Sequence, residues 1–399
     1  MATDIAALQE GARPSARVVP HQVSPGLWTL AWRRLRADRV GMVSLAIVAA
    51  FIVMMILSAT GLIASDWNRE VGVNYAPPTF LGAEAPAAQQ AAAPTAGGAK
   101  PSSEYKSQVV DPIGDVLEQL RSGAATSTPE AGAPPAAADE KSIDPLADVM
   151  ADIRAGKGVT PAAKAEERRA TLPFGGDKWG RDVLKKTIKG SETSIFVGLA
   201  SAALATFLGT FFGAVAGYYG KWVDDFFNWF YSVFSSIPYL LLILAVAAVL
   251  QQKGTLTIIL ILGLTGWTGV FRLLRAEYLK HKSREYVQAA DAIGTSNLRR
   301  MFVHIFPNVS HVVLVQLSIL VVAFIKSEVI LSFLGFGVPV DVVSWGSMLN
   351  EAQNELILGK WWQLVAAGTA MAILVTAFSL FTDALRDALD PKLKGRAGV

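Results

Sequence analysis

Six long stretches without a charged side chain constrain this fold more than any other feature of the sequence. Asp, Glu, Lys and Arg are all missing from residues 40–65, 193–220, 226–252, 254–271, 301–325 and 361–382. A helix that crosses about 30 Å of hydrocarbon needs roughly 20 apolar residues. Five of the stretches meet that length easily, and the glycine-rich fourth is marginal. One such stretch fits a buried soluble helix, but six predict an all-α integral membrane protein with six transmembrane helices.

Basic residues predict the orientation of these helices, because Lys and Arg collect in cytoplasmic loops. They are dense before the first helix, between the fourth and fifth, and after the sixth: Arg13, Arg17, Arg33, Arg34, Arg36 and Arg39; Arg272, Arg275, Lys280, Lys282, Arg284, Arg299 and Arg300; Arg386, Lys392, Lys394 and Arg396. Both termini and the loop at 272–300 are therefore expected to be cytoplasmic. The net charge of +3 reflects this topology, and we predict no nucleic-acid site.

This topology divides the chain into five parts. We expect a cytoplasmic segment at 1–39, a first transmembrane helix at 40–65, a long extracytoplasmic insertion at 66–189, a five-helix core at 190–385 with a cytoplasmic loop at 275–307, and a cytoplasmic tail at 386–399. In the first part, Trp28, Trp32 and Leu35 share one helical face among arginines, which favours a helix in the lipid interface. An ordinary juxtamembrane cluster of positive charge is the alternative.

The insertion is rich in Ala and Pro but contains two related islands, at 111–123 and 144–156. Each begins with Asp-Pro, has apolar residues at helical spacing and ends in Gly, which predicts a short amphipathic helix. The two helices can pack on each other, on the rest of the protein or on a partner.

The segment 284–307 predicts a short helix, a stop at Gly294 and a second helix that reaches Pro307. Its alanines favour helix, and glycine at such a stop adopts a left-handed conformation. Tyr286 and Ala290 are four residues apart and share a face. A large side chain beside small ones suits a face that lies in a partner's groove.

Two further features concern packing within the membrane. Gly209, Gly213 and Gly217 form a small-residue stripe, which usually marks close helix contact, within one chain or between two chains. Pro238 predicts a kink in the third transmembrane helix.

Sequence motifs for catalysis are missing. We find no phosphate-binding Gly-x4-Gly-Lys-Ser/Thr loop, no His-Glu-x-x-His and no EF-hand motif, and therefore predict no catalytic residues, no metal site and no cofactor. The six apolar stretches lack the ionisable groups usual in ion-driven transporters, although carbonyl oxygens can bind sodium instead.

The segment 284–307 also resembles the cytoplasmic loop shared by permease subunits of ABC importers. That loop reads Glu-Ala-Ala, three residues, Gly, nine residues, Ile-x-Leu-Pro. Here Gln288-Ala289-Ala290, Gly294 and His304-x-Phe306-Pro307 keep the spacing. Gln288, His304 and Phe306 depart from the pattern, and the loss of the Glu charge at Gln288 affects the expected contact.

Three other motifs narrow the resemblance to the second, C-type permease subunit of the dipeptide/oligopeptide/nickel transport family. They are the segment 173–184, the sequence Leu331–Gly337 followed by Trp345-Gly346, and the tail segment 383–391. The resemblance covers roughly residues 24–65 and 171–392 and leaves out 83–170.

The resemblance implies half of a translocation pathway for di- or oligopeptides in the bacterial inner membrane. Its implied partners are a second homologous permease subunit, two cytoplasmic ATPase subunits that hydrolyse the ATP, an extracytoplasmic substrate-binding protein and the lipid bilayer. The residues that it assigns to ATPase coupling are Tyr286, Gln288, Ala289, Ala290, Gly294 and Pro307. Glu328 is either a gate residue or a solvated charge at a helix end. Trp345 either contacts the binding protein at the outer mouth or packs its loop.

Three alternatives remain open at this point. The same type of importer can carry a nickel chelate or another small solute. A secondary transporter or channel would act without partner ATPases. A membrane scaffold would act through the islands of the insertion.

Overall fold

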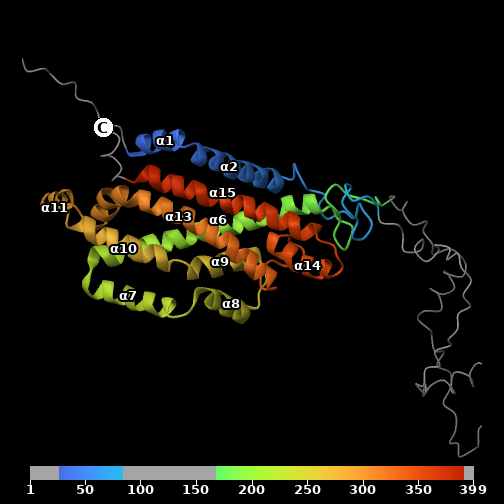
Figure 1. Cartoon of the computed structure of the whole chain (residues 1–399). Helices are drawn as coiled ribbons and strands as arrows, with labels where there is room; N and C mark the ends of the chain where they lie inside the picture. Colours follow the sequence, from blue (N-terminus) through green and yellow to red (C-terminus); the bar gives the residue numbers. More distant parts are fainter. Residues whose placement is uncertain (1–26, 84–167, 391–399) are drawn as a thin grey trace, which may run out of the picture. The chain divides into compact units, whose positions relative to one another are not determined.

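The computed structural model describes residues 27–83 and 168–390, which belong to one compact unit (Figure 1). The predicted islands at 111–123 and 144–156, most of the insertion, residues 1–26 and the end of the tail lie outside the described residues. The described helices are α1 (Leu27–Ala37), α2 (Arg39–Ala59), α6 (Val183–Tyr219), α7 (Lys221–Ser235), α8 (Tyr239–Leu250), α9 (Thr255–Thr265), α10 (Thr268–Lys282), α11 (Glu285–Ala292), α12 (Asn297–Arg299), a π-helix (Arg300–Ile305), α13 (Phe306–Phe333), α14 (Trp345–Ile357) and α15 (Trp362–Leu389).

Helix α6 is the centre of the bundle, because α2, α9, α10, α13 and α15 all contact it. Among residues 27–83 and 168–390, four helices are long and apolar enough to cross a membrane: Arg39–Ala59, Val183–Tyr219, Asn297–Phe333 and Trp362–Leu389. Two bent pairs pass the same test, α7 with α8 at 83° and α9 with α10 at 40°. If each pair is one span, the described residues hold six candidate spans, and the prediction of an all-α membrane protein is confirmed.

The bends have local causes. Pro238 lies at the break between α7 and α8, so the predicted kink is confirmed. The bend between α9 and α10 was not predicted. There, a side chain at Gly266 would come within 2.3 Å of the Phe324 ring of α13, so the missing side chain lets α13 approach the break.

Helix α6 begins at Val183, well before the charge-free stretch that starts at residue 193. Its first turns contain charges that are paired. Lys189 bonds Glu192 at 2.8 Å, and Lys186 is buried beside carboxylates. The charge-free stretch therefore does not mark the start of α6, because the helix extends beyond it into the charged residues.

The glycine stripe of α6 packs against α10 of the same chain. A methyl group at Gly209 would lie 2.6 Å from Cβ of Val270, and one at Gly217 would lie 2.6 Å from the carbonyl oxygen of Arg275. Gly213 meets α10 in the same way, 2.9 Å from the carbonyl oxygen of Phe271. The predicted close contact is confirmed, and it lies within the chain.

Helix α1 contacts α15. Trp28 and Trp32 are about half exposed, whereas Leu35 is buried together with Ala31. The expectation that Leu35 shares the face of the two tryptophans is therefore wrong, because Leu35 packs toward α15.

The bundle has two distinct ends, with α1 and α11 at one and α14 at the other (Figure 1). We call them the α11 end and the α14 end. At the α14 end, isolated bridges join residues 70–78 to residues 169–182. The indole of Trp362 donates a hydrogen bond of 2.7 Å to the carbonyl oxygen of Gly176 and fixes this segment to α15.

Candidate functional site

Helix α11 lies at one end of the bundle, between α10 and α12. It ends at Ala292, and Gly294 follows with a φ of +80°. The Gly294 amide donates to the Asp291 carbonyl at 2.8 Å, and the Thr295 amide donates to the Ala290 carbonyl at 3.1 Å. These bonds satisfy carbonyls at the helix end, as a left-handed stop requires. The predicted stop at Gly294 is confirmed.

The two faces of α11 differ in exposure. Val287 and Ala290 are buried toward the chain's own bundle, at 3% and 5% exposure. Ala289 and Gln288 are exposed, and Ile293 is 82% exposed. Ala290 therefore does not lie on the outward face. It lets the helix approach the bundle closely, and the surface open to a partner is formed by its neighbours.

Tyr286 is partly exposed but already has a partner within the chain. Its hydroxyl lies 2.8 Å from Nδ1 of His281 at the end of α10. Burial raises the pKa of the Tyr286 phenol, so it stays neutral at physiological pH. Gln288 makes a weak bond, from Nε2 to the Ser283 carbonyl at 3.4 Å. The departure from Glu at this position thus leaves an exposed, uncharged amide.

A polar cluster joins α11 to the central helix. Arg300 forms an ion pair with Asp291 of α11 and donates to Oδ1 of Asn297. Tyr218, near the end of α6, donates its hydroxyl to the same Asn297 oxygen at 3.0 Å. The Tyr218 ring also lies within 6 Å of Arg300 and of Lys282. These contacts join α11 and the segment after it to α6, the helix that the other spans contact.

Pro307 does not lie on α11 but near the start of α13, directly after the π-helix Arg300–Ile305. Proline has no amide hydrogen and breaks the regular bonding of an α-helix, and π-turns often occur at functional sites. The hydroxyl of Tyr278 in α10 donates to the Met301 carbonyl inside this turn at 3.3 Å. Pro307 is exposed, and it lies on the connection from α11 to α13 and not on α11 itself.

At the α14 end, Glu328 and Trp345 are both completely buried. Ser332 donates to Oε1 of Glu328 at 2.7 Å, so Glu328 is not a solvated charge at a helix end. The Trp345 indole donates to the Thr187 carbonyl at 3.1 Å, and its amide donates to Oγ of Ser194 at 3.2 Å. The predicted contact of Trp345 with a binding protein does not fit this burial, and its alternative as a packing residue does.

The sequence reasoning missed a buried ionic network at the α14 end. Nζ of Lys186, which is 1% exposed, lies 2.8 Å from Asp177, 2.6 Å from Glu351 and 3.1 Å from Gln363. It joins the segment before α6 to α14 and α15. The sequence did not predict the burial of this lysine, because a lysine just outside an apolar stretch usually faces water.

Glu355 of α14 lies beside this network and is 2% exposed. Burial raises the pKa of its carboxyl to about 7, while the charge of Lys186 acts in the opposite direction. Asp177 and Glu351 raise the pKa further. Within the described ranges, no group of three or more His, Cys, Asp or Glu side chains is placed to hold a metal ion.

Apolar spans around one central helix, with an exposed helix fixed to it at one end, define a multi-span membrane protein. Comparisons with known proteins agree. Residues 209–395 match the family described as binding-protein-dependent transport system inner membrane component. Residues 26–78 match the N-terminal transmembrane domain of oligopeptide transport permease C. The chain belongs to this family of ABC importer permeases, in the C-type branch.

Similar proteins carry matching names. The chain is 37% identical over 221 residues to the dipeptide transport system permease protein DppC of Bacillus subtilis, covering 55% of this chain and 69% of the relative. It is 36% identical over 221 residues to the oligopeptide transport system permease protein OppC of the same organism, covering 55% and 72%. It is 34% identical over 219 residues to the OppC protein of Haemophilus influenzae, covering 55% and 70%.

Proposed function

We propose that this chain is one of two permease subunits of an ATP-driven importer of di- or oligopeptides in a bacterial inner membrane. Three relatives are named as dipeptide or oligopeptide transport permeases, which supports the substrate class. The basic residues support a cytoplasmic location of the α11 end and of both termini. A second permease subunit, two ATPases and an extracytoplasmic binding protein complete the transporter.

In this proposal, the outward face of α11 binds a cytoplasmic ATPase. Ala289 and Gln288 offer a small, uncharged surface beside the projecting side chain of Ile293. Closure of the ATPases on ATP moves α11, and the Asp291–Arg300 pair and Tyr218 carry that movement to α6. The bundle then alternates between inward and outward access, a rigid-body transition of packed helices. The chain gates the pathway and does no chemistry itself.

The observation that carries the proposal is the exposed α11 tied by polar contacts to the central helix. A test compares Gly294→Trp with Gly359→Trp in the purified complex. Both glycines have a positive φ, +80° and +75°, and in both cases an added Cβ meets open space. The backbone strain is therefore matched, while Gly294 follows α11 and Gly359 lies at the α14 end.

We expect Gly294→Trp to abolish co-purification of the ATPase subunits and uptake of a labelled tripeptide into proteoliposomes. Gly359→Trp should keep the ATPases bound. If Gly294→Trp leaves both ATPase binding and uptake intact, α11 is not the docking helix.

The substrate class needs its own experiment. The complete reconstituted importer, with its binding protein, is given dipeptides, tripeptides or a nickel chelate, and ATP hydrolysis is measured. We expect stimulation by peptides. Stimulation by the nickel chelate alone would contradict the peptide assignment and would leave the permease assignment intact.

A further inference from the structure

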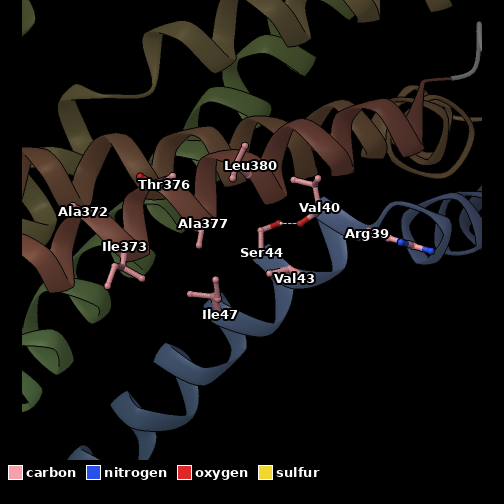
Figure 2. A pocket seen from close by; sticks show the side chains of 10 residues that line it. All are labelled: Arg39, Val40, Val43, Ser44, Ile47, Ala372, Ile373, Thr376, Ala377 and Leu380. Carbon is pink, nitrogen blue, oxygen red and sulfur yellow. Dashed lines mark hydrogen bonds between the residues drawn. The ribbon is translucent and has the colours of Figure 1, made fainter.

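A groove between α2 and α15 takes no part in the proposed coupling of α11 to α6. It has a volume of about 630 Å³, and its walls are almost entirely aliphatic, with Val43 and Ile47 on α2 facing Ile373 and Leu380 on α15. Figure 2 shows Arg39 at one end of this groove, and Ile47 and Ile373 toward the other. Two hydroxyl-bearing residues, Ser44 and Thr376, line it, and the Ser44 hydroxyl donates to the carbonyl of Val40 in its own helix. The floor therefore presents almost no polar group to an occupant.

The dimensions of the groove fit one membrane leaflet. From Arg39 to Ile47 it follows α2 for roughly 12 Å, at 1.5 Å per residue. Half of a 30 Å hydrocarbon core is about 15 Å. The groove thus begins where α2 enters the apolar core and ends near the middle of the membrane.

Arg39 lies at the headgroup level of this groove. Arg39 forms no ion pair or hydrogen bond with any residue in the described part of the chain, whereas Arg34 donates to the Asp390 carbonyl and Arg36 lies over the Trp32 ring. The half-exposed Trp28 and Trp32 of α1 are the side chains that collect at the membrane–water interface. An arginine with free donors at this depth binds phosphate oxygens well.

Both positive and negative side chains lie near the Arg39 end of the groove. Asp383 follows Leu380 of the groove by three residues and so lies one helical turn further along α15, and it is exposed. A headgroup that carries both a phosphate and an ammonium matches Arg39 and Asp383 together. A purely anionic headgroup matches Arg39 alone.

We propose that the α2–α15 groove holds an acyl chain of a membrane phospholipid whose phosphate pairs with Arg39, with phosphatidylethanolamine as the matching headgroup. The occupant links the first span to the last and fixes α1 at the interface. This inference does not depend on the transported substrate. It also does not depend on the proposed role of α11, which packs against α10 and the π-helix and not against α2 or α15.

A photoactivatable phosphatidylethanolamine, with a diazirine in one acyl chain, tests the proposal on the complete importer in lipid nanodiscs. We expect labelled peptides from residues 40–47 and 372–380. Val43→Trp fills the groove and should remove this labelling. Val53→Trp is the matched control, because Val53 is on the same helix and similarly exposed, 53% against 62%, but does not line the groove.

Arg39→Gln should lower the labelling about fivefold, the effect of one arginine near a membrane surface, whereas Arg33→Gln on α1 should leave it unchanged. Labelling spread evenly over α2, or equal in Val43→Trp and Val53→Trp, would show ordinary surrounding lipid and overturn the proposal. So would cross-linking of Val43→Cys to the second permease subunit, because a protein would then occupy the groove.

Discussion

The two ends of the bundle use polar groups in opposite ways. At the α14 end, Asp177 and Lys186 are at most 1% exposed and form a buried network with Glu351. At the α11 end, the Asp291–Arg300 pair is partly open to water, with the Asp291 side chain 66% exposed. A buried ion pair that loses one partner is strongly destabilised, whereas an exposed pair contributes little to stability.

The two ends therefore differ in how firmly they are held and in how easily they can move. The α14 end is held by groups that must all stay together, so it favours one arrangement. The α11 end is held by contacts whose separate free energies are small, so a partner can shift it at low cost. A helix that transmits movement belongs at the second kind of end.

The largest expected effect is that of Lys186→Met. It leaves the carboxylate of Asp177 buried without its cation, which costs about 3–5 kcal/mol in free energy of unfolding. We expect a large fall in Tm and poor recovery of folded protein, measured by size-exclusion chromatography with a fluorescent tag.

Lys185→Met is the matched control for this change. Lys185 bonds Asp66 at 2.7 Å, but both side chains are more than a third exposed. Its loss should cost less than about 1 kcal/mol. Equal effects of the two substitutions would contradict the difference between buried and exposed pairs at this end.

Glu355 predicts how stability depends on pH. Its folded-state pKa of about 7 lies above the ordinary value of 4.5, so the folded protein retains the proton over that interval while the unfolded chain loses it. The stability from this group is therefore complete below about pH 4.5 and is lost as the pH rises to about 7.

Glu355→Gln keeps the side chain neutral. At pH 8 the variant should be more stable than the parent by about 1–3 kcal/mol, and the difference should shrink toward pH 5. Melting curves across this range measure it. A pH-independent difference would show that the carboxyl of Glu355 titrates normally.

The close packing of α6 on α10 gives a prediction of similar or smaller size. Gly209→Ala places a methyl group 2.6 Å from Cβ of Val270 and 2.7 Å from the Trp267 carbonyl oxygen, which should cost about 1–3 kcal/mol. Gly269→Ala, on α10, meets nothing within 4 Å and should not lower the Tm. Similar melting temperatures for the two variants would refute the tight α6–α10 contact.

Tyr218→Phe should have a small effect on stability and a clear effect on coupling. It removes the hydrogen bond to Asn297, worth about 1 kcal/mol, and keeps the ring. We expect intact assembly but weaker stimulation of ATP hydrolysis by substrate. An unchanged stimulation would mean that movement does not pass through this residue.

The sequence predicted features that depend on local chemistry. The apolar stretches located the spans, Pro238 the sharp bend, Gly294 the helix stop, and the glycine stripe a close contact. Each follows from one residue type or from a short pattern.

The features that were missed depend on neighbours distant in sequence. Lys186 is buried because Asp177, Glu351 and Gln363 surround it, and no local pattern shows that arrangement. Ala290 turns inward because the bundle lies beneath α11. The helical spacing gave the period of α11 correctly but not which face is exposed.

Thiol cross-linking in the complete importer tests the central claim, that the outward face of α11 binds an ATPase. The chain contains no cysteine, so a single Ala289→Cys carries the only reactive thiol of this subunit. Ile357→Cys, at the α14 end and 83% exposed, is the control. With a short thiol-linked photo-cross-linker, we predict that Ala289→Cys joins this chain to an ATPase subunit and that Ile357→Cys does not. Failure of Ala289→Cys to cross-link an ATPase in an active complex would contradict the account.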